Sequence, residues 1–243
     1  MKYTLNKTGE IITLPLHDYF SGLKACLADF KVSYLIVIVI AFFASWWIYV
    51  PVHELFHAFG CMLGGGEVGT LNLSPIYGAS FLKRFFPFIS VGSEYAGQLT
   101  DFDTHNSYLT YLLTVFFPYL LTILIGIPLL KSVANNSTSP WINCIKFGAA
   151  LPIAFAPFIS ITGDYYEMGS IIVSRFASFL FSSFQVERWQ SDDLFKLSKE
   201  LFFSNDVVRI GDIGGVILSF LLGIILAFVT YWIGRLWAKV IIK

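Results

Sequence analysis

Two histidines and a glutamate lie close together in residues 50–60, directly after a long apolar run. His53, Glu54 and His57 form the pattern His-Glu-x-x-His. On a helix, residues four apart lie on one face about one turn from each other, so both imidazole rings can reach one metal ion. Glu54 lies beside them, where its carboxylate can activate a metal-bound water. The pattern predicts a zinc site with His53 and His57 as ligands and Glu54 as general base.

A catalytic zinc ion needs a third protein ligand and an open position. Asp164 is the first candidate, because it follows Gly163 at the end of a later apolar segment. Glu167 is the alternative ligand, since it lies one turn further along the same helix face. The other candidates lie in the polar loop after the first apolar segment: Glu94, Asp101, Asp103 and His105. A competing role for Asp164 is to cap a helix that begins after Gly163.

The composition indicates what surrounds these residues. The chain has 243 residues, of which 56% are hydrophobic and 13% are charged, whereas soluble domains carry about 25% charged residues. We therefore expect a multi-pass integral membrane protein, placed in the cell membrane and in contact with the lipid bilayer. The net charge is zero, so nothing favours binding to nucleic acid. The three cysteines lie far apart and form neither a disulfide framework nor a Cys-x-x-Cys metal site.

Apolar runs of about 20 residues predict membrane helices. Four such segments cover about residues 32–63, 107–130, 141–162 and 210–233. The expected fold class is mainly α and polytopic, with about four transmembrane helices and a small β element after the first span. Three glycines, residues 64–66, would end the first helix.

The chain divides into three predicted parts. Residues 1–31 form a polar tail with a short strand near residues 10–14, then an amphipathic helix that lies in the membrane interface or simply packs on the bundle. Residues 32–185 form a membrane core of three spans, with short strands at residues 68–73 and 86–91 in the surface region 64–106. Its last part, residues 168–185, is an interfacial or partly buried helix. Residues 186–243 hold a soluble helix at 192–203, capped by Ser191, and the fourth span.

Counting residues along the spans tests the choice of third ligand. His53 lies about 20 residues along the first span, and Asp164 lies about 22 residues along the third. The first and third spans cross the bilayer in the same direction, so both residues reach the same side at a similar depth. This count predicts that Asp164 meets the histidine pair.

Residues 53–58 read His-Glu-Leu-Phe-His-Ala, and residues 63–68 read Leu-Gly-Gly-Gly-Glu-Val. This region resembles the site-2 protease family of intramembrane zinc metalloproteases, in which a membrane helix with His-Glu-x-x-His precedes a small sheet and a later span supplies an aspartate. The resemblance implies that His53, His57 and Asp164 bind Zn²⁺ and that Glu54 is the general base. The implied activity is intramembrane proteolysis of membrane protein or peptide substrates, which a strand from residues 67–91 would hold by edge pairing.

Two features depart from the family pattern. The third-ligand segment reads Gly163-Asp164-Tyr165 instead of Asp-Gly, and residues 117–121 contain Pro118 but lack the asparagine of the family's Gly-Pro-x-x-Asn element. The resemblance therefore describes a divergent and minimal member.

Other classes of protein compete with this interpretation. A non-proteolytic membrane protein, such as a transport or assembly subunit, would use the histidine pair as a structural or metal-storing site. A di-iron oxidase or desaturase needs many more histidines than the four of this chain, so we exclude it. A different zinc protease lineage would use Glu167 in place of Asp164.

Overall fold

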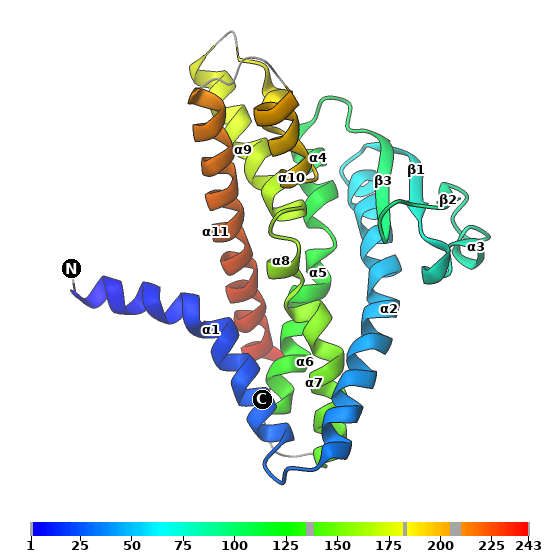
Figure 1. Cartoon of the computed structure of the whole chain (residues 1–243), viewed down its shortest axis with the longest axis vertical. Coiled ribbons are helices and arrows are strands. Elements are labelled where there is room, and N and C mark those ends of the chain that lie inside the picture. The colour runs from blue at the N-terminus through cyan, green and yellow to red at the C-terminus, as the bar shows by residue number, and fades with distance from the viewer. Residues whose placement is uncertain (1, 135–138, 182–183, 205–209, 243) are drawn as a thin grey trace.

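The computed structural model describes residues 2–134, 139–181, 184–204 and 210–242. The chain is mainly helical, with a small sheet beside one end of a helix bundle (Figure 1). The helices in chain order are α1 (Lys2–Cys26), α2 (Val32–Leu63), η1 (Pro75–Tyr77), α3 (Ala79–Leu82), α4 (Tyr108–Phe116), α5 (Tyr119–Leu121), η2 (Thr122–Gly126), α6 (Ile127–Val133), α7 (Pro140–Ala154), α8 (Ala156–Ile159), α9 (Asp164–Leu180), η3 (Val186–Trp189), α10 (Leu194–Lys199), η4 (Glu200–Ser204) and α11 (Ile210–Ile241).

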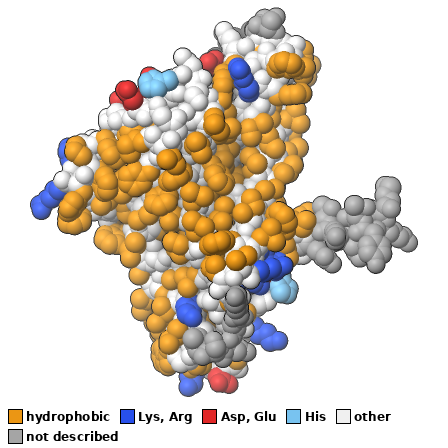
Figure 2. All heavy atoms as spheres, turned by 180° about the vertical axis from the view of Figure 1, so that it is seen from behind, with side chains coloured by type: hydrophobic (Ala, Val, Ile, Leu, Met, Phe, Trp, Pro, Cys, Tyr) orange, Lys and Arg blue, Asp and Glu red, His pale blue; other side chains and the backbone are white. Residues whose placement is uncertain are grey.

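Two of these helices, α2 and α11, are long and apolar enough to cross a membrane. A third candidate span consists of α4 and the helical stretch Tyr119–Val133, if the two are counted together across a 51° bend. Large apolar side chains of α2 point outward, with Ile40 62% and Phe43 64% exposed. Figure 2 shows hydrophobic side chains over most of one face, with charged groups mainly toward its ends. This outward apolar surface suits a lipid environment better than water.

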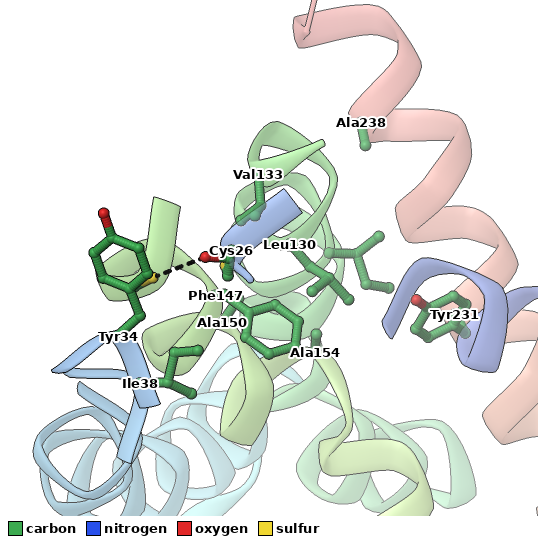
Figure 3. Packing of buried hydrophobic residues seen from close by; sticks show 12 residues of the cluster. Cys26, Tyr34, Ile38, Leu130, Val133, Phe147, Ala150, Ala154, Tyr231 and Ala238 are labelled. Carbon is green, nitrogen blue, oxygen red and sulfur yellow. Dashed lines mark hydrogen bonds between the residues drawn. The ribbon is translucent and has the colours of Figure 1, made fainter. Parts of the chain in front are cut away.

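One apolar core joins the helices at the end of the bundle away from the sheet. Cys26 of α1, Ile38 of α2, Phe147 of α7 and Tyr231 of α11 are all buried there (Figure 3). Cys26 and Cys144 both lie in this core as free thiols, and the Cys144 thiol donates to the carbonyl of Cys26. They act as small apolar residues.

Helix α1 differs from the prediction of a polar tail with a short strand. Residues 2–26 form one helix, and the strand predicted near residues 10–14 is wrong, because local propensity is overridden by packing of the following turns on the bundle. Asp18, whose side chain is fully buried, binds Lys131 at 3.0 Å and Arg235 at 3.1 Å. The Tyr231 hydroxyl donates to the same carboxylate. The second half of α1 is therefore a helix packed on the bundle, one of the two alternatives for the predicted amphipathic helix, and it ends at Cys26, before residue 31.

Prolines interrupt the second and third apolar segments, which were predicted as continuous helices. Pro118 and Pro157 have no N–H, so the carbonyls four residues earlier lack a helical donor. Each carbonyl is satisfied from a neighbouring helix. The Ile153 carbonyl accepts from the Thr122 hydroxyl at 2.7 Å, and the Thr114 carbonyl accepts from the His57 ring.

The sheet contains three strands in the order β2-β1-β3. They are β1 (Glu67–Leu73), β2 (Ile89–Val91) and β3 (Gly97–Asp103). Strand β1 pairs parallel with β2 and antiparallel with β3. The sequence predicts the first two strands but a polar loop in place of β3, because only Leu99 and Phe102 in it are large apolar residues. Its pairing with β1, a tertiary contact, makes it a strand.

The segment after the third apolar run packs against the last helix. Helix α9 lies along α11, and the close approach depends on Gly169, where a Cβ would meet the Ser219 carbonyl. The helix predicted at residues 192–203 is shorter: α10 spans Leu194–Lys199 and passes into a π turn. Its cap is Asp193 and not Ser191, since the Asp193 carboxylate accepts from the amides of Phe195 and Lys196.

Candidate metal centre and its cavity

Three of the predicted site residues converge at one point. His53 Nε2 lies 3.1 Å from His57 Nε2 and 3.2 Å from Asp164 Oδ2. His57 Nε2 lies 3.6 Å from the same carboxylate oxygen. Within the described part of the chain, this is the one group of three such side chains close enough to hold a metal ion. The count of depth along the spans thus placed Asp164 correctly beside the histidines.

These separations can be compared with those of a tetrahedral zinc site. With zinc–nitrogen and zinc–oxygen distances near 2.0–2.1 Å, ligand atoms lie about 3.3 Å apart. The three separations of 3.1, 3.2 and 3.6 Å bracket that value. The side chains are 11–18% exposed, which leaves a side of the group open to solvent. The residues present therefore fit a zinc ion with a free fourth position.

The orientation of His57 is fixed by the bend in the second apolar segment. Its Nδ1–H donates to the Thr114 carbonyl at 2.9 Å, the acceptor that Pro118 leaves without a helical donor. This bond makes Nε2 the lone-pair nitrogen, as a metal ligand requires. Helix α4 comes this close because Gly60 has no side chain: a Cβ there would lie 2.6 Å from the Leu113 carbonyl oxygen.

His53 has a partner on its own helix. The Tyr49 hydroxyl lies 2.8 Å from His53 Nδ1, and it accepts the Nδ1 proton in the tautomer that leaves Nε2 free for a metal. Tyr49 is four residues before His53, so it lies on the same helix face one turn away. Both histidines thus have their second nitrogen engaged, which is the usual arrangement for metal-binding imidazoles.

Asp164 is held by groups from two helices. The buried Tyr119 hydroxyl donates to Asp164 Oδ2 at 2.5 Å, and the Asp164 amide donates to Ser160 Oγ. Burial acts to raise the pKa of Asp164, but His57, His53 and Tyr119 together lower it below its ordinary range. The competing role as helix cap does not hold, because Gly163 occupies the cap position and Asp164 is the first residue of α9.

The alternative ligand Glu167 lies outside this group. Its carboxylate accepts from the Tyr111 hydroxyl at 2.6 Å. Burial raises the pKa of Glu167 to about 8, although the Tyr111 hydrogen bond acts in the opposite direction. A protonated carboxyl is a poor metal ligand, so both its position and its protonation favour Asp164.

The remaining candidates also lie elsewhere. His105 Nδ1 is 3.3 Å from Asp103 Oδ2 and its Nε2 is 3.8 Å from Glu67, all on the exposed end of the sheet. Glu94 and Asp101 are likewise exposed. None of these side chains belongs to the converging group.

Strand β3 begins directly against Glu54. A Cβ on Gly97 would overlap the Glu54 side chain at Cγ and would lie 2.9 Å from Cδ. Gly97 therefore lets the sheet approach the carboxylate and confines it. Sequence reasoning missed Gly97, as well as Tyr49 and Tyr119. The spacing of four residues between Tyr49 and His53 was a usable signal, but the roles of Gly97 and Tyr119 depend on tertiary contacts.

A polar cavity of about 710 Å³ opens at this group. Glu54, His57 and Asp164 line it on one side, and residues 97–100 of β3 line another. Asp192 also lines the cavity, and its carboxylate accepts from the side-chain amide of Gln98 on β3. The cavity therefore gives solvent access to His57 and Asp164 of the converging group.

The chain matches no family model, no curated protein and no solved structure.

Proposed function

We propose that this chain is a zinc metallopeptidase that cleaves membrane-associated protein or peptide substrates. The observation that carries the proposal is the convergence of His53, His57 and Asp164 beside Glu54 at the wall of a polar cavity. In this proposal α2, the bent segment from α4 to α6, α7 with α8, and α11 all cross the membrane. The His-Glu-x-x-His helix would then be the first of four spans.

Each side chain of the site has a separate role in the proposed hydrolysis. Bound zinc would supply Lewis acidity, which polarises a carbonyl group and makes water acidic near neutral pH. Glu54 takes a proton from the attacking water and delivers it to the leaving amine. Tyr49 and the Thr114 carbonyl hold the two imidazole rings, and Tyr119 holds the Asp164 carboxylate.

The substrate backbone would be held by β3. This strand lies at the edge of the sheet, and its residues 97–100 face the cavity that contains Glu54. An extended peptide can add to such an edge through main-chain hydrogen bonds. Edge pairing was expected from a strand within residues 67–91; the strand next to the site is β3 instead.

Metal removal tests the proposed function. We expect purified protein to hold one zinc per chain and to cleave a membrane-peptide library. A chelator should abolish cleavage and added zinc should restore it, since the acidity of the water depends on the metal. Zinc content is measured by elemental mass spectrometry, and cleavage by peptide mass spectrometry. Purified protein without stoichiometric zinc would favour the non-proteolytic alternative.

Gly97→Ala should slow turnover without loss of zinc. The new methyl group would push the Glu54 carboxylate aside, and displacements of about 1 Å can cost up to roughly a hundredfold in rate. The control is Gly214→Ala, where a Cβ meets nothing within 4 Å. Turnover number and zinc content are measured for both variants. Equal turnover in Gly97→Ala and wild type would contradict the positioning role of Gly97.

A further inference from the structure

A second, smaller pocket lies on the other side of Glu54. Its volume is about 150 Å³. The apolar part of its wall, which we call the apolar pocket, comprises Trp46, Val50, Ala96, Pro152, Ala156 and Ile159. Tyr49, His53, Glu54 and Ser160 complete the wall, and Glu54 also lines the polar cavity. The same carboxylate therefore separates a polar space from an apolar one.

The position of the apolar pocket limits what can occupy it. Any group in it lies against Glu54 and His53, so it is adjacent to the atoms proposed to react. Ala96 on its wall directly precedes Gly97, where β3 begins. A peptide held on the β3 edge would thus reach the apolar pocket at the end of its pairing with the sheet.

The size and chemistry of the apolar pocket point to one side chain. Its 150 Å³ is below the roughly 300–1,000 Å³ of sites that bury whole small molecules. Most of its lining is aliphatic or aromatic, and its one carboxylate, Glu54, is the proposed base, so an uncharged side chain suits it best. An aliphatic or phenyl side chain satisfies both limits.

We propose that the apolar pocket selects substrates by accepting an apolar side chain next to the scissile bond. This inference deepens the proposed peptidase function and depends on it for the identity of the occupant. Peptides with Leu or Phe at that position should bind better than peptides with Gly, because their side chain leaves water for the pocket.

The test measures binding separately from cleavage. The probe is a set of fluorescein-labelled peptides that differ at one central residue, which is Gly, Ala, Leu or Phe. Zinc-loaded full-length Glu54→Gln protein in detergent binds them, and fluorescence anisotropy gives the dissociation constants. We expect the Leu peptide to bind about tenfold or more tightly than the Gly peptide.

Three further substitutions locate the preference. In the Glu54→Gln background, Ala96→Leu fills the apolar pocket and should remove the Leu preference. Ala134→Leu makes the same change at the exposed residue that caps the C-terminus of α6 and should keep it. Trp46→Ala should widen the pocket and move the preference toward Phe.

Two results would overturn the inference: no preference for Leu over Gly, or a preference that Ala96→Leu leaves unchanged. The second result is also the one expected if a lipid or detergent chain fills the pocket. Cleavage of the same peptides by the wild-type chain is scored independently. Selective binding without any cleavage would remove the peptidase function and leave the pocket as a peptide-binding site.

Discussion

Glu54→Gln should retain one zinc per chain and lose turnover by roughly 100- to 10,000-fold, the usual contribution of a positioned general base. Glutamine keeps the size of the side chain and its packing against Gly97, but it cannot accept the proton of the attacking water. The three candidate ligands are untouched, so metal content should not change. Zinc stoichiometry and the rate of peptide cleavage are measured on the same preparation.

The control for this substitution is Glu94→Gln, which removes an exposed carboxylate of the surface region. Its turnover and zinc content should equal those of the wild type. Cleavage by Glu54→Gln at the wild-type rate would show that another group acts as the base. Loss of zinc in Glu54→Gln would instead show that Glu54 supports the metal.

Asp164→Ala is expected to have the largest effect on metal binding. Removing an outer-shell partner of a metal site costs about 10- to 100-fold in affinity, and removing a ligand should cost more. Because alanine also leaves the buried Tyr119 hydroxyl without its acceptor, Asp164→Asn is measured in parallel. Asparagine keeps an acceptor for Tyr119 but lacks the charge that binds zinc. Zinc affinity is determined by competition with a chelating dye.

The matched comparison is Glu167→Gln, which preserves an acceptor for Tyr111. We expect this variant to bind zinc like the wild type, since Glu167 lies outside the converging group. The opposite pattern, with zinc lost in Glu167→Gln and kept in Asp164→Asn, would identify Glu167 as the third ligand. Circular dichroism of each variant separates loss of zinc from loss of fold.

The amino-acid sequence was most informative where local pattern and long-range geometry coincide. The apolar run and the three following glycines predicted α2 with its correct ends. Helical spacing joined His53 to His57, and counting depth along two spans brought Asp164 to them. These arguments succeed because residue spacing along a helix and along an apolar segment converts directly into distance.

Other features of the site depend on contacts between residues far apart in the sequence. Strand β3 carries a weak apolar alternation and is a strand because β1 pairs with it. Gly97 contacts Glu54 across more than forty positions of sequence, and nothing local distinguishes it from other loop glycines. Tyr119 lies within residues 117–121, but its partner Asp164 belongs to a later helix, so local sequence does not indicate the contact.

Pro118 breaks the helical segment from α4 to α6 at a point where the released carbonyl still finds a partner. An unpaired carbonyl in hydrocarbon costs several kcal/mol, which normally selects against such a break. Here the acceptor that Pro118 releases is satisfied by the His57 ring. The bent helix and the oriented imidazole are therefore interdependent: straightening the helix with a residue that has an N–H would give the Thr114 carbonyl a second donor. The break at Pro118 and the orientation of the His57 ring are thus linked by a single hydrogen bond.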